Sequence, residues 1–162
     1  PLPCVAGRGA GRGAGRRVTG PAPAGTHDAL GRPLHPPSAA MPAPFTPIAT
    51  PADLDALAAA PAALLFKHSD RCPISGEAYE EVEAFARRHP GLPVWIVDVI
   101  DRRNLSLAAA DRFGVRHQSP QAILLVDGRA AWDASHFQVR AAVLEERIAR
   151  VLGDAWPLDA AG

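Results

Sequence analysis

Residues 64–75 read Leu-Leu-Phe-Lys-His-Ser-Asp-Arg-Cys-Pro-Ile-Ser, a short apolar run that leads into a turn with one cysteine. An apolar run of this length between polar residues is typical of a buried strand. Residues 75–88 then repeat apolar side chains at helical spacing and carry glutamate and arginine on the opposite face. The stretch therefore predicts a strand, a turn that presents Cys72, and a long helix.

Regular signals continue on both sides of this stretch. Thr50-Pro51 predicts the start of a helix that ends near Ala60, because a hydroxyl cap followed by proline suits a first turn. Later segments predict a strand at 94–97, a helix at 104–112 capped by Asn104, a hairpin through Asp127-Gly128, and a last helix over about 139–152. From Leu64 the order is β-α-β-α-β-β-α after an N-terminal helix. This order predicts an α/β protein with a central mixed sheet flanked by helices, as in the thioredoxin-like fold.

The first 40 residues differ in composition from the rest of the chain. They are rich in glycine, arginine and proline, and hold five arginines with Asp28 as the only acid. Such a composition cannot bury enough apolar area to order its backbone, so residues 1–40 are predicted to be a disordered tail. An upstream translation artefact or an inert tail is favoured over a transit peptide or a nucleic-acid-binding arm. The predicted domain spans 41–153, and residues 154–162 form a C-terminal tail.

Charge and cysteine content exclude several classes of function. Residues 41–162 hold 12 Lys+Arg against 16 Asp+Glu, so the mildly acidic domain has no electrostatic reason to bind nucleic acid. No apolar run is long enough to span a membrane. Cys4 lies in the low-complexity tail, and a stable disulfide between it and Cys72 is not expected. One thiol in the domain fits a reducing compartment, which predicts a cytoplasmic protein.

Cys72 is the candidate nucleophile, because it lies where the strand gives way to the helix. The unpaired N–H groups of a helix N-terminus favour a thiolate, and Arg71 and Lys67 are close enough in sequence to add positive charge. Pro73 suits the first turn, where its missing N–H costs nothing. The alternative is an inert cysteine packed among apolar side chains, but the position at a turn argues against burial.

Two further positions complete the predicted site. Ser75 stands where a dithiol oxidoreductase carries its second cysteine, and serine cannot resolve a mixed disulfide. The second thiol must then come from solution or from another protein. Ser119-Pro120 directly precedes the predicted third strand, where thioredoxin-like folds place a cis-proline facing the cysteine. An ordinary trans proline at a strand start is the alternative.

Four separated segments carry a family resemblance: Phe66–Ser69, Cys72–Ser75, Gly114–Gln121 and Trp132–His136. Together they resemble the monothiol bacilliredoxin family, also described as bacillithiol-system redox-active proteins, over about residues 46–152. The resemblance implies a thioredoxin fold without a bound cofactor. It also implies that Cys72 removes bacillithiol, the co-substrate, from S-bacillithiolated client proteins.

Ser135 and His136 are expected at the start of the last helix, where related glutaredoxins hold a carboxylate of their thiol. Helix N–H groups there would suit the malate carboxylates of bacillithiol, although Ser135 as a simple cap explains the sequence equally well. A metal site made by His68, His117, His136 and Cys72 is disfavoured, because the histidines lack the paired spacing of zinc sites. No metal is therefore predicted.

Three functions remain open from the sequence. The first is a monothiol exchange enzyme that acts on bacillithiol mixed disulfides. The second is a thioredoxin-like adaptor in which Cys72 has no redox turnover and is alkylated slowly. The third is a relative with different chemistry, either a glutathione-using monothiol glutaredoxin-like enzyme or a peroxide-reducing or transferase protein. The identity of the clients, and of the reductant that restores Cys72, does not follow from the sequence.

Overall fold

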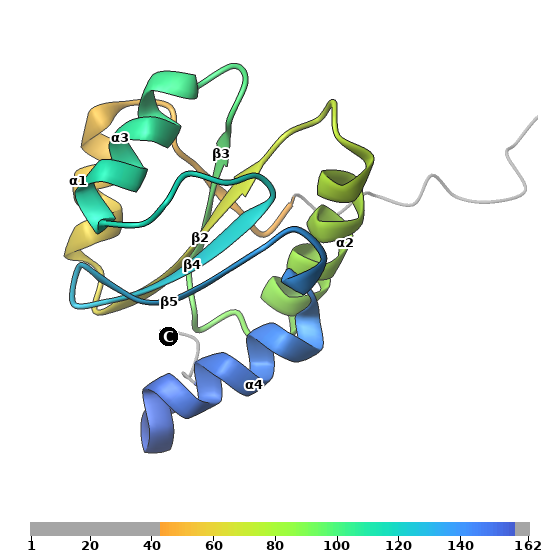
Figure 1. Cartoon of the computed structure of the whole chain (residues 1–162). Helices are drawn as coiled ribbons and strands as arrows, with labels where there is room; N and C mark the ends of the chain where they lie inside the picture. The colour runs from red at the N-terminus through yellow and green to blue at the C-terminus, as the bar shows by residue number, and fades with distance from the viewer. Residues whose placement is uncertain (1–42, 158–162) are drawn as a thin grey trace, which may run out of the picture. The chain divides into compact units, whose positions relative to one another are not determined.

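The computed structural model describes residues 43–157 (Figure 1). The chain divides into two units, residues 1–41 and 42–162, and the described residues all belong to the second. The predictions for the tail 1–40, for Cys4 and for the last residues of the C-terminal tail lie outside the described residues. Over residues 43–157, no helix is both long enough and apolar enough to cross a membrane.

The described chain alternates strands and helices as the sequence predicts. The elements are β1 (Thr46–Pro47), α1 (Pro51–Ala59), β2 (Ala62–His68), α2 (Pro73–Arg88), β3 (Val94–Asp98), α3 (Arg103–Phe113), β4 (Gln121–Val126), β5 (Arg129–Ser135), the 3₁₀ turn η1 (His136–Gln138), α4 (Ala141–Leu152) and the 3₁₀ turn η2 (Gly153–Ala155). The predicted fold class is confirmed. Among the strands and α-helices of the described residues, β1 alone has no counterpart in the prediction, because two residues that include a proline give no strand pattern.

The sheet places β2 at its centre. The strand order is β1-β3-β2-β4-β5, in which β2 is parallel to β3 and antiparallel to β4. Leu65 of β2 lies opposite Trp95 on one side and Ile123 on the other. Because β2 leads directly into the turn before α2, Cys72 lies just beyond the C-terminal end of the central strand.

Helices cover both faces of the sheet, with α1 and α3 on one side and α2 and α4 on the other (Figure 1). Successive side chains of a strand point to opposite faces, so Leu64 and Phe66 pack toward α2 and α4, while Leu65 packs toward α1 and α3. All three are fully buried. Two covered faces explain why the strand is continuously apolar in sequence rather than alternating.

The hairpin between β4 and β5 turns at Asp127-Gly128, as predicted. Both residues are left-handed, with φ of 49° and 71°, which is the conformation that a two-residue hairpin turn needs. A Cβ on Gly128 would also lie 2.7 Å from the Ala58 carbonyl oxygen. Glycine is therefore required there both by the turn and by the close approach of α1.

Two predicted helix starts are wrong. α3 begins at Arg103 with Arg102 as its N-cap, so Asn104 lies inside the helix and does not cap it. α4 begins only at Ala141. Val139 precedes it and is buried in the core, where its apolar side chain mimics the helical pattern of the following residues.

Candidate active site: one thiol at a helix N-terminus

Cys72 occupies the N-cap position of α2 and is half-buried. Its extended backbone directs its carbonyl into the helix, where it accepts hydrogen bonds from the N–H groups of Ser75 at 2.9 Å and Gly76 at 3.1 Å. Pro73 fills the first helical position and is exposed. Cys72 is the free cysteine of residues 43–157. The prediction that the thiol lies at a helix N-terminus is thus confirmed in its geometry.

Ser75 is fully buried and holds the turn together from inside. Its Oγ accepts a hydrogen bond from the Ser69 N–H at 2.9 Å and lies 3.2 Å from His68 Nδ1, to which its O–H can donate. Burial lowers the pKa of His68, against the opposing effects of Asp98, Ser75 and Asp70, so a neutral imidazole can accept this bond. The Ser75 hydroxyl, which stands where a second cysteine would be, is therefore a structural group. Both of its hydrogen bonds are made to residues of the turn and of the strand before it.

The Ser119–Pro120 peptide bond is cis, in agreement with the sequence prediction. Pro120 is buried and leads directly into β4, the neighbour of β2. Gln121 fixes the preceding loop, because its Nε2 donates to the Arg116 carbonyl and to Asp133 Oδ2, both at 3.0 Å. The hydroxyl of Ser119 is buried and has no hydrogen-bond partner among the described residues.

Ser135 and His136 lie beside Pro120 and do not begin the last helix, which corrects the sequence prediction. Ser135 is the final residue of β5, and its Oγ donates to Gln118 Oε1 at 2.5 Å. His136 has a left-handed φ of 54°, and its N–H donates to the Pro120 carbonyl at 2.9 Å. The left-handed residue turns the chain into η1, and this inserted turn delays the start of α4.

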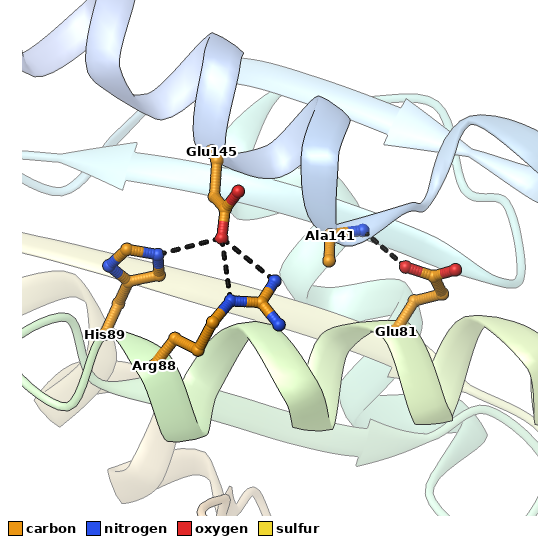
Figure 2. A network of polar contacts seen from close by, with 5 residues as sticks. All are labelled: Glu81, Arg88, His89, Ala141 and Glu145. Atoms are coloured by element: carbon orange, nitrogen blue, oxygen red, sulfur yellow. Dashed lines mark hydrogen bonds and ion pairs between the residues drawn. The ribbon is translucent and has the colours of Figure 1, made fainter.

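A side chain of this protein already occupies the N-terminus of α4. Glu81 of α2 reaches across, and its Oε2 accepts a hydrogen bond from the Ala141 N–H at 2.8 Å (Figure 2). A carboxylate is well placed there, because the helix dipole is positive at this end. The predicted docking of a thiol carboxylate on this helix end would have to compete with Glu81.

The same two helices are joined again further along their length. Glu145 of α4 accepts hydrogen bonds from Arg88 Nε at 3.0 Å and from His89 Nε2 at 3.1 Å (Figure 2). The bond to His89, followed by that to Arg88, holds the pKa of Glu145 below its ordinary value of 4.5. The Glu81–Ala141 contact and the contacts of Glu145 lie side by side in Figure 2. Together they hold α4 against α2, the helix that follows Cys72.

We expect Glu145→Gln to weaken the fold most at neutral pH. A carboxyl group whose pKa is lowered by folding stabilises the folded state above its unfolded pKa, and this contribution is lost as the pH falls. The difference in unfolding free energy between wild type and variant should therefore shrink between pH 5 and pH 3. We expect it to stay below about 1 kcal/mol at pH 7, since the pair is partly exposed. Urea denaturation of both proteins at pH 7 and at pH 3 measures this difference. An equal loss of unfolding free energy at the two pH values would contradict the prediction.

A groove of about 540 Å³ runs between α2, η1 and α4. Its lining begins two residues beyond Cys72 at Ile74 and includes Phe137, an aromatic side chain that is 64% exposed. Two arginines line it, and each lies against a glutamate already described: Arg88 contacts Glu145, and Arg140 is 3.9 Å from Glu81. The groove thus combines apolar side chains such as Ile74 and Phe137 with charged ones, glutamates among them.

Lys67, expected from the sequence to add positive charge near Cys72, has a different position in the structure. Lys67 is fully buried, and its Nζ lies 2.7 Å from Nδ1 of His117. Burial lowers the pKa of Lys67 to about 8. The pKa of His117 is also lowered, by its own burial and then by the charges of Lys67 and Arg103. The sequence distinguishes this residue in one respect, because Lys67 is its only lysine.

The buried amine should make stability depend on pH in the alkaline range. Between pH 8 and pH 10.5 the unfolded chain retains the lysine proton while the folded chain has lost it, so stability rises with pH across this window. We expect the rise to be at most roughly 3 kcal/mol. Lys67→Met should lack it. The measurement is urea denaturation of both proteins at pH 7.5 and pH 10, and parallel pH profiles would contradict the prediction.

The three histidines considered as metal ligands have different surroundings. His68 contacts Ser75, His117 contacts Lys67, and the exposed His136 borders Pro120. Over residues 43–157, no group of three or more histidine, cysteine, aspartate or glutamate side chains is arranged to hold a metal ion.

A thioredoxin fold with one thiol at the N-terminus of α2, a serine in place of the second cysteine and a proline directly before β4 is typical of a single-cysteine thiol–disulfide oxidoreductase. Residues 46–144 match the family described as monothiol bacilliredoxin BrxC, and the chain belongs to this family.

Solved structures agree with this class. A protein assigned as an oxidoreductase with a thioredoxin fold is 25% identical, with a TM-score of 0.59 over 63% of this chain and 91% of that one. Thioredoxin from Fasciola hepatica is 24% identical, with a TM-score of 0.53 over 65% and 98% of the two chains. A mutant thioredoxin from Halobacterium salinarum NRC-1 is 21% identical, with a TM-score of 0.55 over 67% and 92%. The last two likenesses are evidence for the fold alone.

Proposed function

We propose that this protein removes bacillithiol from S-bacillithiolated client proteins in a reducing compartment, the cytoplasm. The observation that carries the proposal is the single half-buried thiol at the start of α2, with a fully engaged serine where a second thiol would stand. Membership of the monothiol bacilliredoxin family supports bacillithiol as the small thiol.

The reaction takes place in two exchanges. The Cys72 thiolate attacks the bacillithiol sulfur of the mixed disulfide, the client–bacillithiol S–S bond breaks, and a Cys72–bacillithiol S–S bond forms. The client leaves as a thiolate and takes up a proton. A second bacillithiol thiolate then attacks the bacillithiol sulfur of the adduct, which releases bacillithiol disulfide and restores the Cys72 thiolate. In sum, one disulfide is exchanged for another: the client–bacillithiol disulfide and one free bacillithiol thiol become the client thiol and bacillithiol disulfide, and no outside oxidant or reductant is consumed.

The surroundings of Cys72 suit this sequence of steps. Ser75 cannot supply the second thiol, so the adduct waits for a thiol from solution. Since β4 is paired on both sides, by β2 and β5, an extended client segment would lie instead along the loop backbone that precedes Pro120. The exposed Phe137, which lines the groove between α2, η1 and α4, offers apolar contact to the same client.

Intact-mass measurement tests the proposal. The reduced protein is mixed separately with a bacillithiolated client and with the same client glutathionylated. A bacillithiol adduct on Cys72, accompanied by free client, is the expected result. A glutathione adduct alone would retain the exchange chemistry and favour a glutaredoxin-like enzyme. No adduct from either client, together with slow alkylation of Cys72, would favour the adaptor and overturn the proposal.

A further inference from the structure

Lys67 is an unusual residue in this chain. It is the only lysine, and the sixteen other members of the Lys+Arg set are arginines. It is also fully buried. An arginine at this position would carry a charge that it cannot lose and several donors that need partners, whereas an amine can give up its proton. Lysine is therefore the basic residue that this buried position accommodates.

The side chain of Lys67 reaches a loop that is distant in sequence. Lys67 is the penultimate residue of β2 and points, like Leu65, to the α1–α3 side of the sheet. Its Nζ lies 2.7 Å from His117 Nδ1, and within residues 43–157 it makes no ion pair with a carboxylate. A buried amine without an acidic partner is costly. The imidazole of His117 is thus the hydrogen-bond partner that the structure gives this amine.

His117 belongs to the Pro120 loop, which we define as residues 114–120. Gln121 ties this loop to β4 and β5 through Arg116 and Asp133. The Lys67–His117 contact ties it to the central strand, three residues before Pro120. We propose that this contact holds the Pro120 loop in register with β2, and that Lys67 is a positioning residue for the client segment that docks beside Pro120. This inference rests on the proposed function.

The inference separates client binding from the reactivity of the thiol. Cys72 is held by its own bonds to α2 and by the Ser75 bonds within the turn, and none of these involves Lys67. Loss of the lysine contact should loosen the loop without moving the sulfur. Loss of this contact should therefore raise KM for a protein client, while kcat and the alkylation rate of Cys72 stay close to the wild-type values.

The test compares Lys67→Met with wild type, using the full chain and a bacillithiolated protein client. We expect KM to rise roughly tenfold with kcat changed less than about twofold, the worth of one lost hydrogen bond in binding. Iodoacetamide should alkylate Cys72 equally fast in both proteins. Ser106→Ala is the matched control, because Ser106 is an equally buried polar residue of α3 whose hydroxyl has no partner among the described residues.

The second variant, His117→Leu, removes the same contact from the loop side. It should raise KM by a similar factor, and the double variant should show no further rise, because only one contact is lost. Since the chain has a single lysine, selective ¹⁵N labelling gives one side-chain amine signal, which His117→Leu should shift. An unchanged KM in both variants, additive effects, or a parallel loss of kcat and alkylation would overturn the inference. Failure of the proposed function is distinguishable, because wild type itself would then form no adduct.

Discussion

Cys72→Ser is expected to reduce the release of bacillithiol from clients to the uncatalysed background. A serine hydroxyl is not ionised near neutral pH and forms no disulfide, so the first exchange cannot begin. The substitution keeps a side chain of similar size at the N-cap of α2, a position that serine favours. The fold should therefore be retained. Release of free client, followed by mass spectrometry alongside a circular dichroism melt, checks both parts of the prediction.

Ser75→Ala is the matched control for this substitution, since it removes a hydroxyl three residues away in the same turn. Much of the exchange should remain, because Ser75 takes no part in the chemistry. The fold should lose about 1–3 kcal/mol, because the buried Ser69 N–H loses its acceptor. Full exchange by Cys72→Ser would refute the central assignment. Complete inactivity of folded Ser75→Ala would assign the hydroxyl a chemical role.

Phe66→Ala should cause the largest loss of stability among single substitutions considered in this protein. Phe66 is fully buried in β2 and contacts the rings of Tyr79 and His68, with centroids 6.5 Å and 5.7 Å away. Removal of a buried phenylalanine ring costs about 3–5 kcal/mol, through lost burial and the cavity that remains. That is a large part of the roughly 5–15 kcal/mol by which a domain is stable. Urea denaturation at pH 7 measures it.

Phe137→Ala provides the comparison for this stability change. The same ring is removed from a side chain that is 64% exposed in η1, so the unfolding free energy should change by less than about 1 kcal/mol. Because Phe137 lines the groove between α2, η1 and α4, its loss should weaken client binding and leave folding unchanged. Equal destabilisation by the two substitutions would mean that Phe66 is not the core residue that its burial indicates.

The fold could be predicted because its signals are local. Residues 64–66 read as a strand and residues 75–88 as a helix from the spacing of apolar side chains. Asp127-Gly128 reads as a hairpin turn because few residues adopt left-handed φ easily. The position of Cys72 at a strand-to-helix junction also followed from this pattern. The prediction of a cis-proline rested on two signals, the local Ser119-Pro120 dipeptide and the thioredoxin-like order of the elements around it.

The sequence by itself thus determined the order of the elements, the layered α/β fold, the one thiol of the predicted domain and the serine that stands where a second cysteine would. Only the tertiary structure decided how Lys67 meets His117, and how Glu81 takes the N–H of Ala141 at the start of α4. Each of these contacts joins residues 50 or 60 positions apart. No local periodicity reports such a contact, because it depends on which helix face and which loop the packed sheet brings together.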